Sequence, residues 1–222
     1  MSNIINLLIV DDHPFIIEGY KHGINAYKSK ENYQFNISQA KNCETGYEAI
    51  MNAEVPFDVV FLDLNMPAYE EKNIFSGEDL ALLIQKQMPD ARLIMLTMTN
   101  DMEKVLSLID TVNPNGLAIK NDLGHKELLL GFDKIMKNLH YYSDSVVKLL
   151  SKPQYEGYDF DQFDKEILTQ ISKGIKPRYL LKYVPLTSEV VINRRKNLFK
   201  VLGVKTDLDQ DLLDKARKKG LL

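Results

Sequence analysis

The stretch "LLIVDDHPF", Leu7 to Phe15, decides the fold of the first half of this chain. Four apolar residues lead directly into Asp11 and Asp12, and Pro14 stands at a position typical of a first helical turn. A continuous apolar run predicts a strand that is buried on both faces, as in a parallel sheet covered by helices. Two adjacent carboxylates at the end of such a strand repel each other and are costly to desolvate, so their position requires a physical reason.

The pattern of an apolar strand followed by an amphipathic helix occurs five times in residues 1–140. This alternation predicts an α/β fold with a doubly wound sheet of five parallel strands. Ser76 is the expected N-cap of the third helix. The expected strands are 4–10, 33–40, 57–65, 91–98 and 116–120, and the expected helices are 14–24, 43–53, 76–88, 101–112 and 125–139.

Charge divides the chain into two parts of opposite sign. Residues 1–150 hold 13 Lys/Arg and 21 Asp/Glu, whereas residues 151–222 hold 15 Lys/Arg and 10 Asp/Glu. An acidic first part and a basic second part indicate two modules with different partners. A basic module can meet nucleic acid or an anionic surface.

Composition excludes several classes of protein. The N-terminus lacks the basic segment of a signal peptide, and no apolar stretch approaches the ~20 residues of a membrane helix. Cys43 is the one cysteine, so no intramolecular disulfide is possible and a reduced thiol is expected. With 45% hydrophobic residues among 222, the chain can bury a core, and we expect a cytoplasmic protein of one or two domains.

Polar residues stand at the C-terminal ends of four of the predicted strands. This edge of an open parallel sheet is where ligands bind, so the residues should converge in space. Three carboxylates favour a hard divalent cation, for which Mg²⁺ is the expected ion, and a hydroxyl with an ammonium suits a phosphoryl group. The residues are Asp11 and Asp12 after the first strand, Asp63 at the end of "VVFLD" in the third, Thr97 in "LIMLT" of the fourth and Lys120 in "GLAIK" of the fifth.

Each of these residues also has a plainer interpretation. A lone Asp after a strand is often a turn residue or a helix N-cap, Thr97 alone suits an ordinary strand, and Lys120 alone suits a solvated loop. Their coincidence at consecutive strand ends favours a functional site. A carboxylate can accept a phosphoryl group covalently, and Asp63 ends a central strand whereas Asp11 and Asp12 are better placed to hold a metal.

The motifs "VDDHP", "FLDLNMP", "LT" and "IK" resemble, in order and spacing, the receiver domain of two-component response regulators. The resemblance implies a flavodoxin-like fold over residues 1–140, with Asp63 phosphorylated by a histidine kinase. It implies Mg²⁺ on Asp12, Asp63 and the backbone carbonyl of Asn65, with Asp11 nearby through water. It further implies that Thr97 and Lys120 engage the phosphoryl oxygens.

The sequence departs from the family pattern at three places. Loop 68–76 is long and acidic, which either shapes kinase choice or dephosphorylation or is only a tolerated insertion, the interpretation we favour. Leu117 replaces the usual aromatic residue three positions before the lysine, which puts a switch based on an aromatic rotamer in doubt. Asn121 and Asp122 follow the lysine in place of the commoner Pro or Ser.

Residues 141–160 are predicted to be a linker, and residues 161–222 an all-α domain of four helices. Glycines at 174, 203 and 220 stand where helix-ending glycines are expected. The pattern resembles the helix-turn-helix domain of LuxR/NarL/FixJ-type regulators. The expected helices are 161–174, 176–184, 187–203 and 207–220.

The third of these helices is the expected DNA-recognition helix. It combines an apolar face with a basic one, and a basic face can enter the major groove. A run of charged residues alone is more often a solvated helix face. The lysine that is usual in the family is replaced by Ile192. A protein with weak or altered DNA binding is therefore an open alternative. The candidate DNA contacts are Lys176, Arg178, Thr187 (also the expected N-cap), Asn193, Arg194, Arg195, Lys196 and Lys200.

The sequence therefore predicts a response regulator in which phosphorylation controls binding to double-stranded DNA, with a homodimer as the expected phosphorylated form. A Mg²⁺-dependent phosphohydrolase would need a second acid two residues after the nucleophile, where this chain has Asn65, so we expect no enzyme. A protein-interaction role for the C-terminal helices is the other alternative.

Overall fold

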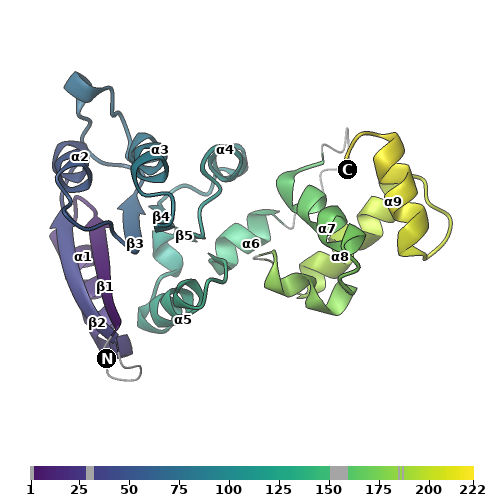
Figure 1. The fold of residues 1–222 in the computed structure, drawn as a ribbon, viewed down its shortest axis with the longest axis horizontal. Coiled ribbons are helices and arrows are strands. Elements are labelled where there is room, and N and C mark those ends of the chain that lie inside the picture. Colours follow the sequence, from purple (N-terminus) through teal and green to yellow (C-terminus); the bar gives the residue numbers. More distant parts are fainter. Residues whose placement is uncertain (1–2, 29–32, 151–159, 185, 187) are drawn as a thin grey trace. The chain divides into compact units, whose positions relative to one another are not determined.

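The computed structural model describes residues 3–28, 33–150, 160–184, 186 and 188–222 (Figure 1). They form two compact units, Met1–Val146 and Val147–Leu222. Within the predicted linker 141–160, residues 141–142 form a strand and residues 144–150 form a helix, and the bounds of the linker stay a prediction. No helix in the described part of the chain has the length and apolar character needed to cross a membrane.

The first unit contains a parallel sheet in the order β2-β1-β3-β4-β5-β6, which confirms the predicted α/β class. The sheet has six strands where five were predicted. The sixth strand has only two residues, so it has no alternation to detect. It pairs with β5, and the N–H groups of Tyr141 and Ser143 donate to the carbonyls of Asn115 and Leu117. The strands are β1 (Asn3–Val10), β2 (Tyr33–Ala40), β3 (Val59–Asp63), β4 (Arg92–Thr97), β5 (Gly116–Ile119) and β6 (Tyr141–Tyr142).

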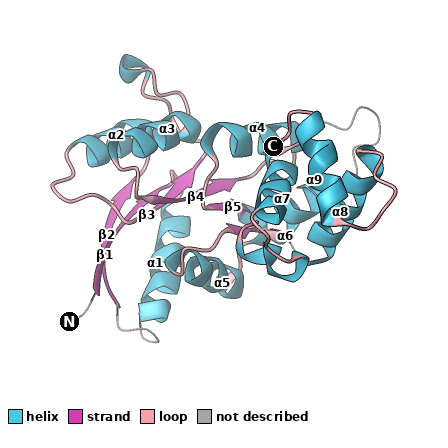
Figure 2. Ribbon diagram, turned by 45° about the vertical axis from the view of Figure 1, so that its right-hand side comes forward, coloured by secondary structure: helices cyan, strands magenta, loops and turns pink. Residues whose placement is uncertain are grey.

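Helices cover both faces of this sheet, with α1 and α5 on one side and α2, α3 and α4 on the other (Figure 2). Ser76 caps α3 as predicted, because its hydroxyl accepts from the Glu78 N–H and the Asp79 carboxylate completes the capping box. The helices are α1 (Pro14–Lys28), α2 (Cys43–Met51), α3 (Gly77–Gln87), α4 (Met102–Val112), α5 (His125–Met136) and α6 (Asp144–Leu150), with 3₁₀ helices η1 (Glu70–Lys72) and η2 (Lys120–Asp122).

The central strands are apolar because both of their faces are buried. All five residues of β3 are buried, and Phe61 packs between Tyr20 of α1 and Phe132 of α5, with ring centroids 5.5 and 5.9 Å away. Fully burying one such side chain stabilises the fold by about 1.5–3 kcal/mol. This packing leaves the strand register fixed, and with it the place where each strand ends.

The acidic insertion after β3 has a defined structure. Tyr69 and Ile74 form an antiparallel bridge around η1, and Asn73 adopts a left-handed conformation with φ of 56°. The turn rests on α2, since the Tyr69 ring lies 5.8 Å from the ring of Tyr47 and Lys72 lies over that same ring. Its role in kinase choice or dephosphorylation stays a prediction.

The second unit contains α7 (Gln162–Ser172), η3 (Pro177–Lys182), α8 (Ser188–Val201) and α9 (Asp209–Lys218). The all-α prediction is confirmed, and the second segment is a six-residue 3₁₀ helix that begins at Pro177. The buried residues of this unit include Ile167, Leu180, Leu198 and Leu212. Glycines 174, 203 and 220 have φ of 79°, 64° and 71°, as expected for residues that end helices.

Candidate functional site

The register of the sheet brings Asp11 and Asp63 together. Val10 pairs with Leu62 between β1 and β3, so the next residue of each strand, Asp11 and Asp63, stands at the same level. Both side chains are buried, with 0% and 2% of their surface exposed, whereas the side chain of Asp12 is 32% exposed. The convergence predicted from the strand ends is therefore present for the carboxylates.

Lys120 joins the two buried carboxylates. Its Nζ lies 2.7 Å from an oxygen of Asp63, to which it donates a hydrogen bond, and 2.7 Å from Asp11 Oδ2 as an ion pair. Burial raises the pKa of Asp63, and the hydrogen bond and charge of Lys120 oppose this effect. Burial alone would lower the pKa of Lys120, but its interactions with the two carboxylates raise it above the ordinary value.

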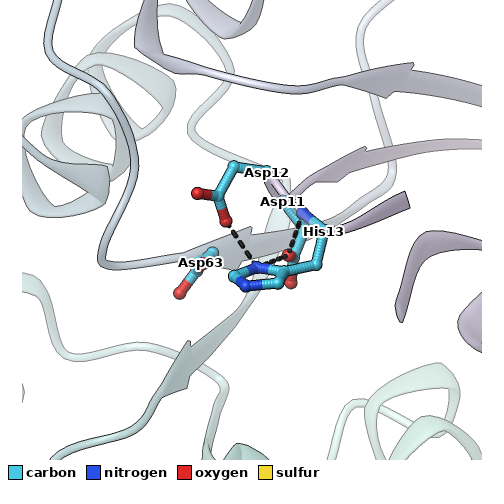
Figure 3. Close-up of side chains that lie close together, drawn as sticks. All are labelled: Asp11, Asp12, His13 and Asp63. Atoms are coloured by element: carbon cyan, nitrogen blue, oxygen red, sulfur yellow. Dashed lines mark hydrogen bonds and ion pairs between the residues drawn. The ribbon is translucent and has the colours of Figure 1, made fainter. Parts of the chain in front are cut away.

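Four side chains offer ligand atoms that lie within 4.8 Å of one another, namely Asp11, Asp12, His13 and Asp63 (Figure 3). His13 Nδ1 lies 2.6 Å from Asp12 Oδ1 and 3.2 Å from Asp11 Oδ1. The sequence motif contained His13 but gave it no role. Its position directly after Asp11 and Asp12 is the sequence feature that could have indicated a role.

The carboxylates of this cluster fit a hard divalent cation. Asp11 Oδ2 is buried, and the partner that the described residues offer it is the Lys120 ammonium at 2.7 Å. A set of carboxylate oxygens is what Mg²⁺ prefers. The backbone N–H of Asn65 donates to Asp63 Oδ1 at 3.2 Å, and the role of its carbonyl in holding the metal stays a prediction.

Mg²⁺ should raise the melting temperature of the protein, because it neutralises carboxylates that repel each other in the folded state. A ligand at 100 times its Kd stabilises by about 2.7 kcal/mol. Thermal unfolding with and without Mg²⁺ measures the gain. Asp12→Ala should lose most of it, whereas Asp90→Ala, a change at an exposed acid outside the cluster, should keep it. An equal gain in both variants would contradict the site.

Thr97 ends β4 and is buried, with its hydroxyl accepting a hydrogen bond from the Thr99 N–H at 3.0 Å. It lies beside a hollow of about 400 Å³ that is also lined by Asn65, Ser76 and Lys104. Leu117, at the position of the usual aromatic residue, is completely buried in β5. The fold therefore leaves a hollow next to the C-terminal ends of β3 and β4. Leu117 is buried and has no aromatic ring, so it supplies no ring that could move into this hollow.

In the second unit, the described side chains of α8 include an exposed stripe. Asn193, Lys196 and Lys200 lie on it at helical spacing, with Ile192 beside them. Lys176 and Arg178 are exposed at the start of η3. Thr187, both as an N-cap and as a DNA contact, lies outside the described residues.

Arg194 does not lie on this exposed stripe, which corrects its predicted placement. Its Nη1 lies 2.8 Å from Asp161 and 3.1 Å from Asp164, and its Nη2 donates to the Leu150 carbonyl at 2.6 Å. Only 12% of its side chain is exposed. The reason is periodicity, because Arg194 follows the buried Val191 by three residues and so faces the core.

Arg195 is also held inside the unit. Its guanidinium donates two hydrogen bonds to Asp209 of α9, at 2.7 and 3.1 Å, and lies over the Phe199 ring. The side chain is 24% exposed, so it too departs from the solvated basic face that was predicted. Asp161, Asp164 and Asp209 were visible as acids in the sequence, but nothing local linked them to these arginines.

Comparisons with known proteins agree with this geometry. The model of the response regulator receiver domain matches residues 7–114. The transcriptional regulatory protein MctR of Rhizobium johnstonii is 27% identical over 206 residues, covering 91% of this chain and 89% of that protein. A nitrate/nitrite response regulator protein homolog of Haemophilus influenzae is 27% identical over 208 residues, covering 92% and 93%.

Solved structures share the fold along the whole chain. RcsB of Salmonella typhimurium matches with a TM-score of 0.57 and 21% identity, covering 98% of this chain and 100% of that one. A structure of two RcsB dimers bound to two parallel DNAs matches with a TM-score of 0.55 and 21% identity, covering 97% and 98%. At this identity the likeness concerns the fold alone.

Proposed function

We propose that Asp63 is the phosphoacceptor of this chain, whose residues 7–114 match the response regulator receiver domain and which is similar over about nine-tenths of its length to known response regulators. One observation carries the proposal: Asp63 ends a central strand with Asp11 and Lys120 gathered around its carboxylate. The chemistry of this arrangement matches what a carboxylate nucleophile needs, which is a nearby cation for the incoming phosphoryl oxygens.

In the proposed reaction, a carboxylate oxygen of Asp63 attacks the phosphorus of a phosphohistidine on the kinase. The new O–P bond forms as the N–P bond breaks, and the histidine leaves with its nitrogen lone pair. Lys120 turns its ammonium to a phosphoryl oxygen and Thr97 donates its hydroxyl to another. Mg²⁺ on Asp11, Asp12 and Asp63 would supply the remaining charge neutralisation when bound.

The test is to incubate the protein with a small phosphodonor and Mg²⁺ and to measure its intact mass. We expect the addition of one phosphoryl group that depends on Mg²⁺, with peptide mapping that places it on Asp63. The proposal would be contradicted by a phosphoryl group on any other residue, or by phosphoryl incorporation that does not depend on Mg²⁺. Asn65 stands where a phosphohydrolase needs its second acid, so we expect no turnover of other phosphate esters.

We further propose that the exposed stripe of α8 binds double-stranded DNA, and that phosphorylation favours a homodimer that presents two such helices. The basic charge of residues 151–222, the exposure of Asn193 and Lys196, and the DNA-bound structures of RcsB support this assignment. Lys176 and Arg178 are then suited to phosphate contacts beside the recognition helix.

Changing Lys196 and Lys200 together to Ala should weaken DNA binding. The slope of log K against log salt should fall by about 1 for each phosphate that a lysine no longer neutralises. Fluorescence anisotropy with a labelled duplex at several salt concentrations measures both effects. The matched control is Lys215→Ala with Lys218→Ala, which removes the same charge from exposed positions of α9. If both double variants bound DNA equally weakly, the loss would come from the change in net charge and not from the exposed stripe of α8.

The alternative role, protein interaction, has its own structural support. Tyr179 and Leu181 of η3 and Tyr183 directly after it are 44%, 41% and 40% exposed, so three large side chains are exposed along one short segment. If the phosphorylated protein bound no duplex at low salt, this apolar surface would become the leading candidate for a partner site.

A further inference from the structure

Asp122, two residues after Lys120, is held by two serines at the start of α6. Its carboxylate accepts hydrogen bonds from the Ser143 hydroxyl at 2.6 Å, the Ser145 hydroxyl at 2.8 Å and the Ser145 backbone N–H at 2.9 Å. We call Asp122, Ser143 and Ser145 the Asp122 cluster. These bonds join η2, which begins at Lys120, to the segment that follows β6.

Within the cluster, Ser143 fixes the backbone on both sides of Lys120. Its hydroxyl accepts from the Ile119 N–H at 3.1 Å while it donates to Asp122, so it touches the residue before Lys120 and the second residue after it. Its own N–H donates to the Leu117 carbonyl at 3.0 Å. Ser143 is completely buried, so water does not substitute readily for these bonds.

The same carboxylate stabilises the first turn of α6. The N–H of Ser145 is one of the helix-terminal donors that have no partner within the helix, and Asp122 accepts it. A negative charge at this end is also favoured by the helix dipole. The chain passes from the first unit into the second within α6, between Val146 and Val147.

We propose that Asp122 and Ser143 are positioning residues for Lys120, and that the Asp122 cluster couples occupation of the phosphorylation site to the stability of α6. The inference rests on the proposed function of Asp63. If the cluster holds Lys120 where it meets the phosphoryl oxygens, then a bound phosphoryl group must in return favour the intact cluster, since coupling between two sites is reciprocal. With Leu117 buried, this route needs no aromatic rotamer.

The test uses the full chain, Mg²⁺ and beryllofluoride as a phosphoryl mimic. In the wild type, beryllofluoride should slow amide hydrogen exchange over residues 145–150. Asp122→Asn and Ser143→Ala should abolish this slowing and weaken beryllofluoride binding about fivefold or more. Binding of Mg²⁺ alone, measured by its effect on the melting temperature, should be unchanged, because the carboxylates of the metal cluster are not altered.

Tyr27→Phe is the matched control, because it removes another hydroxyl-to-carboxylate bond, to Asp133 at 3.2 Å, from a different part of the first unit. It should retain the exchange response and the affinity. Ser145→Ala, which leaves the bonds beside Lys120 in place, should reduce the exchange response more than the affinity. This split distinguishes positioning from a general loss of stability.

Two results would overturn the inference: a wild type that binds beryllofluoride with no change of exchange in α6, or cluster variants that retain both the response and the affinity. Failure of the proposed function gives a different result, since a wild type in which Asp63 is not the acceptor would bind no beryllofluoride at all.

Discussion

Asp63→Asn is expected to abolish phosphoryl incorporation while leaving the fold intact. An amide is not a nucleophile toward phosphorus at neutral pH, and the change also removes one of the three carboxylates proposed to hold Mg²⁺. The amide oxygen can still accept the hydrogen bond that Lys120 donates at 2.7 Å. Intact-mass measurement after incubation with a small phosphodonor and Mg²⁺ should show no added phosphoryl group.

The same variant should also be more stable than the wild type at neutral pH without metal. Because burial raises the pKa of Asp63 in the folded state, ionisation of this carboxyl costs stability, and the stability present at low pH is lost as the pH rises through the folded-state pKa. An amide does not ionise, so Asp63→Asn avoids that loss. Chemical denaturation at acidic and neutral pH should show the advantage of the variant only at the higher pH.

Asp12→Asn is the appropriate control, since it changes a partly exposed carboxylate of the same cluster and leaves the acceptor in place. We expect it to slow incorporation without preventing it. An adduct that persisted in Asp63→Asn at the wild-type rate would show that the phosphoacceptor had been assigned to the wrong residue.

The candidate phosphorylation site could be predicted because its residues lie where periodic features of the sequence end. An apolar run that stops at Asp11 and another that stops at Asp63 predict two strand ends, and a parallel sheet brings such ends to one edge. Lys120 followed from the same rule applied to β5.

Contacts between side chains that are distant in the sequence could not be predicted in this way. Asp122 meets Ser143 across 21 residues, and Arg194 meets Asp164 across 30, and neither pair leaves a periodic trace. The two-residue strand β6 could not be predicted for a related reason, because it is defined by its pairing with β5 and not by a pattern in its own sequence.

The basic face of α8 shows how a local rule can mislead. The run of Arg194, Arg195 and Lys196 suggests one charged surface, but a helix turns about 100° per residue, so these neighbours point in different directions. The periodicity that places Leu198 in the core also brings Arg194 inward, and only Lys196 of the three is exposed. Burial of an arginine required acids at and near the start of α7, which the sequence of α8 alone does not contain.

Arg194→Ala should therefore destabilise the second unit and not simply weaken DNA binding. The change removes an ion-pair partner of the buried Asp164, whose side chain is 1% exposed, and removes the guanidinium that donates to the Leu150 carbonyl. Breaking a buried ion pair by removing one partner costs roughly 3–5 kcal/mol. Because a domain is typically stable by only about 5–15 kcal/mol, far-ultraviolet circular dichroism in urea should show a large fall in the unfolding midpoint of this unit.

Lys196→Ala provides the contrast, because Lys196 is exposed on the same helix two residues away and should change stability by less than about 0.5 kcal/mol. Arg194→Lys should lie between the two, since an ammonium keeps the charge but cannot span Asp161, Asp164 and the Leu150 carbonyl with one planar group. The order of stability expected is wild type, then lysine, then alanine at position 194. If Arg194→Ala unfolded at the same urea concentration as Lys196→Ala while losing DNA binding, Arg194 would be a DNA contact after all, and its ion pairs would carry little of the stability of this unit.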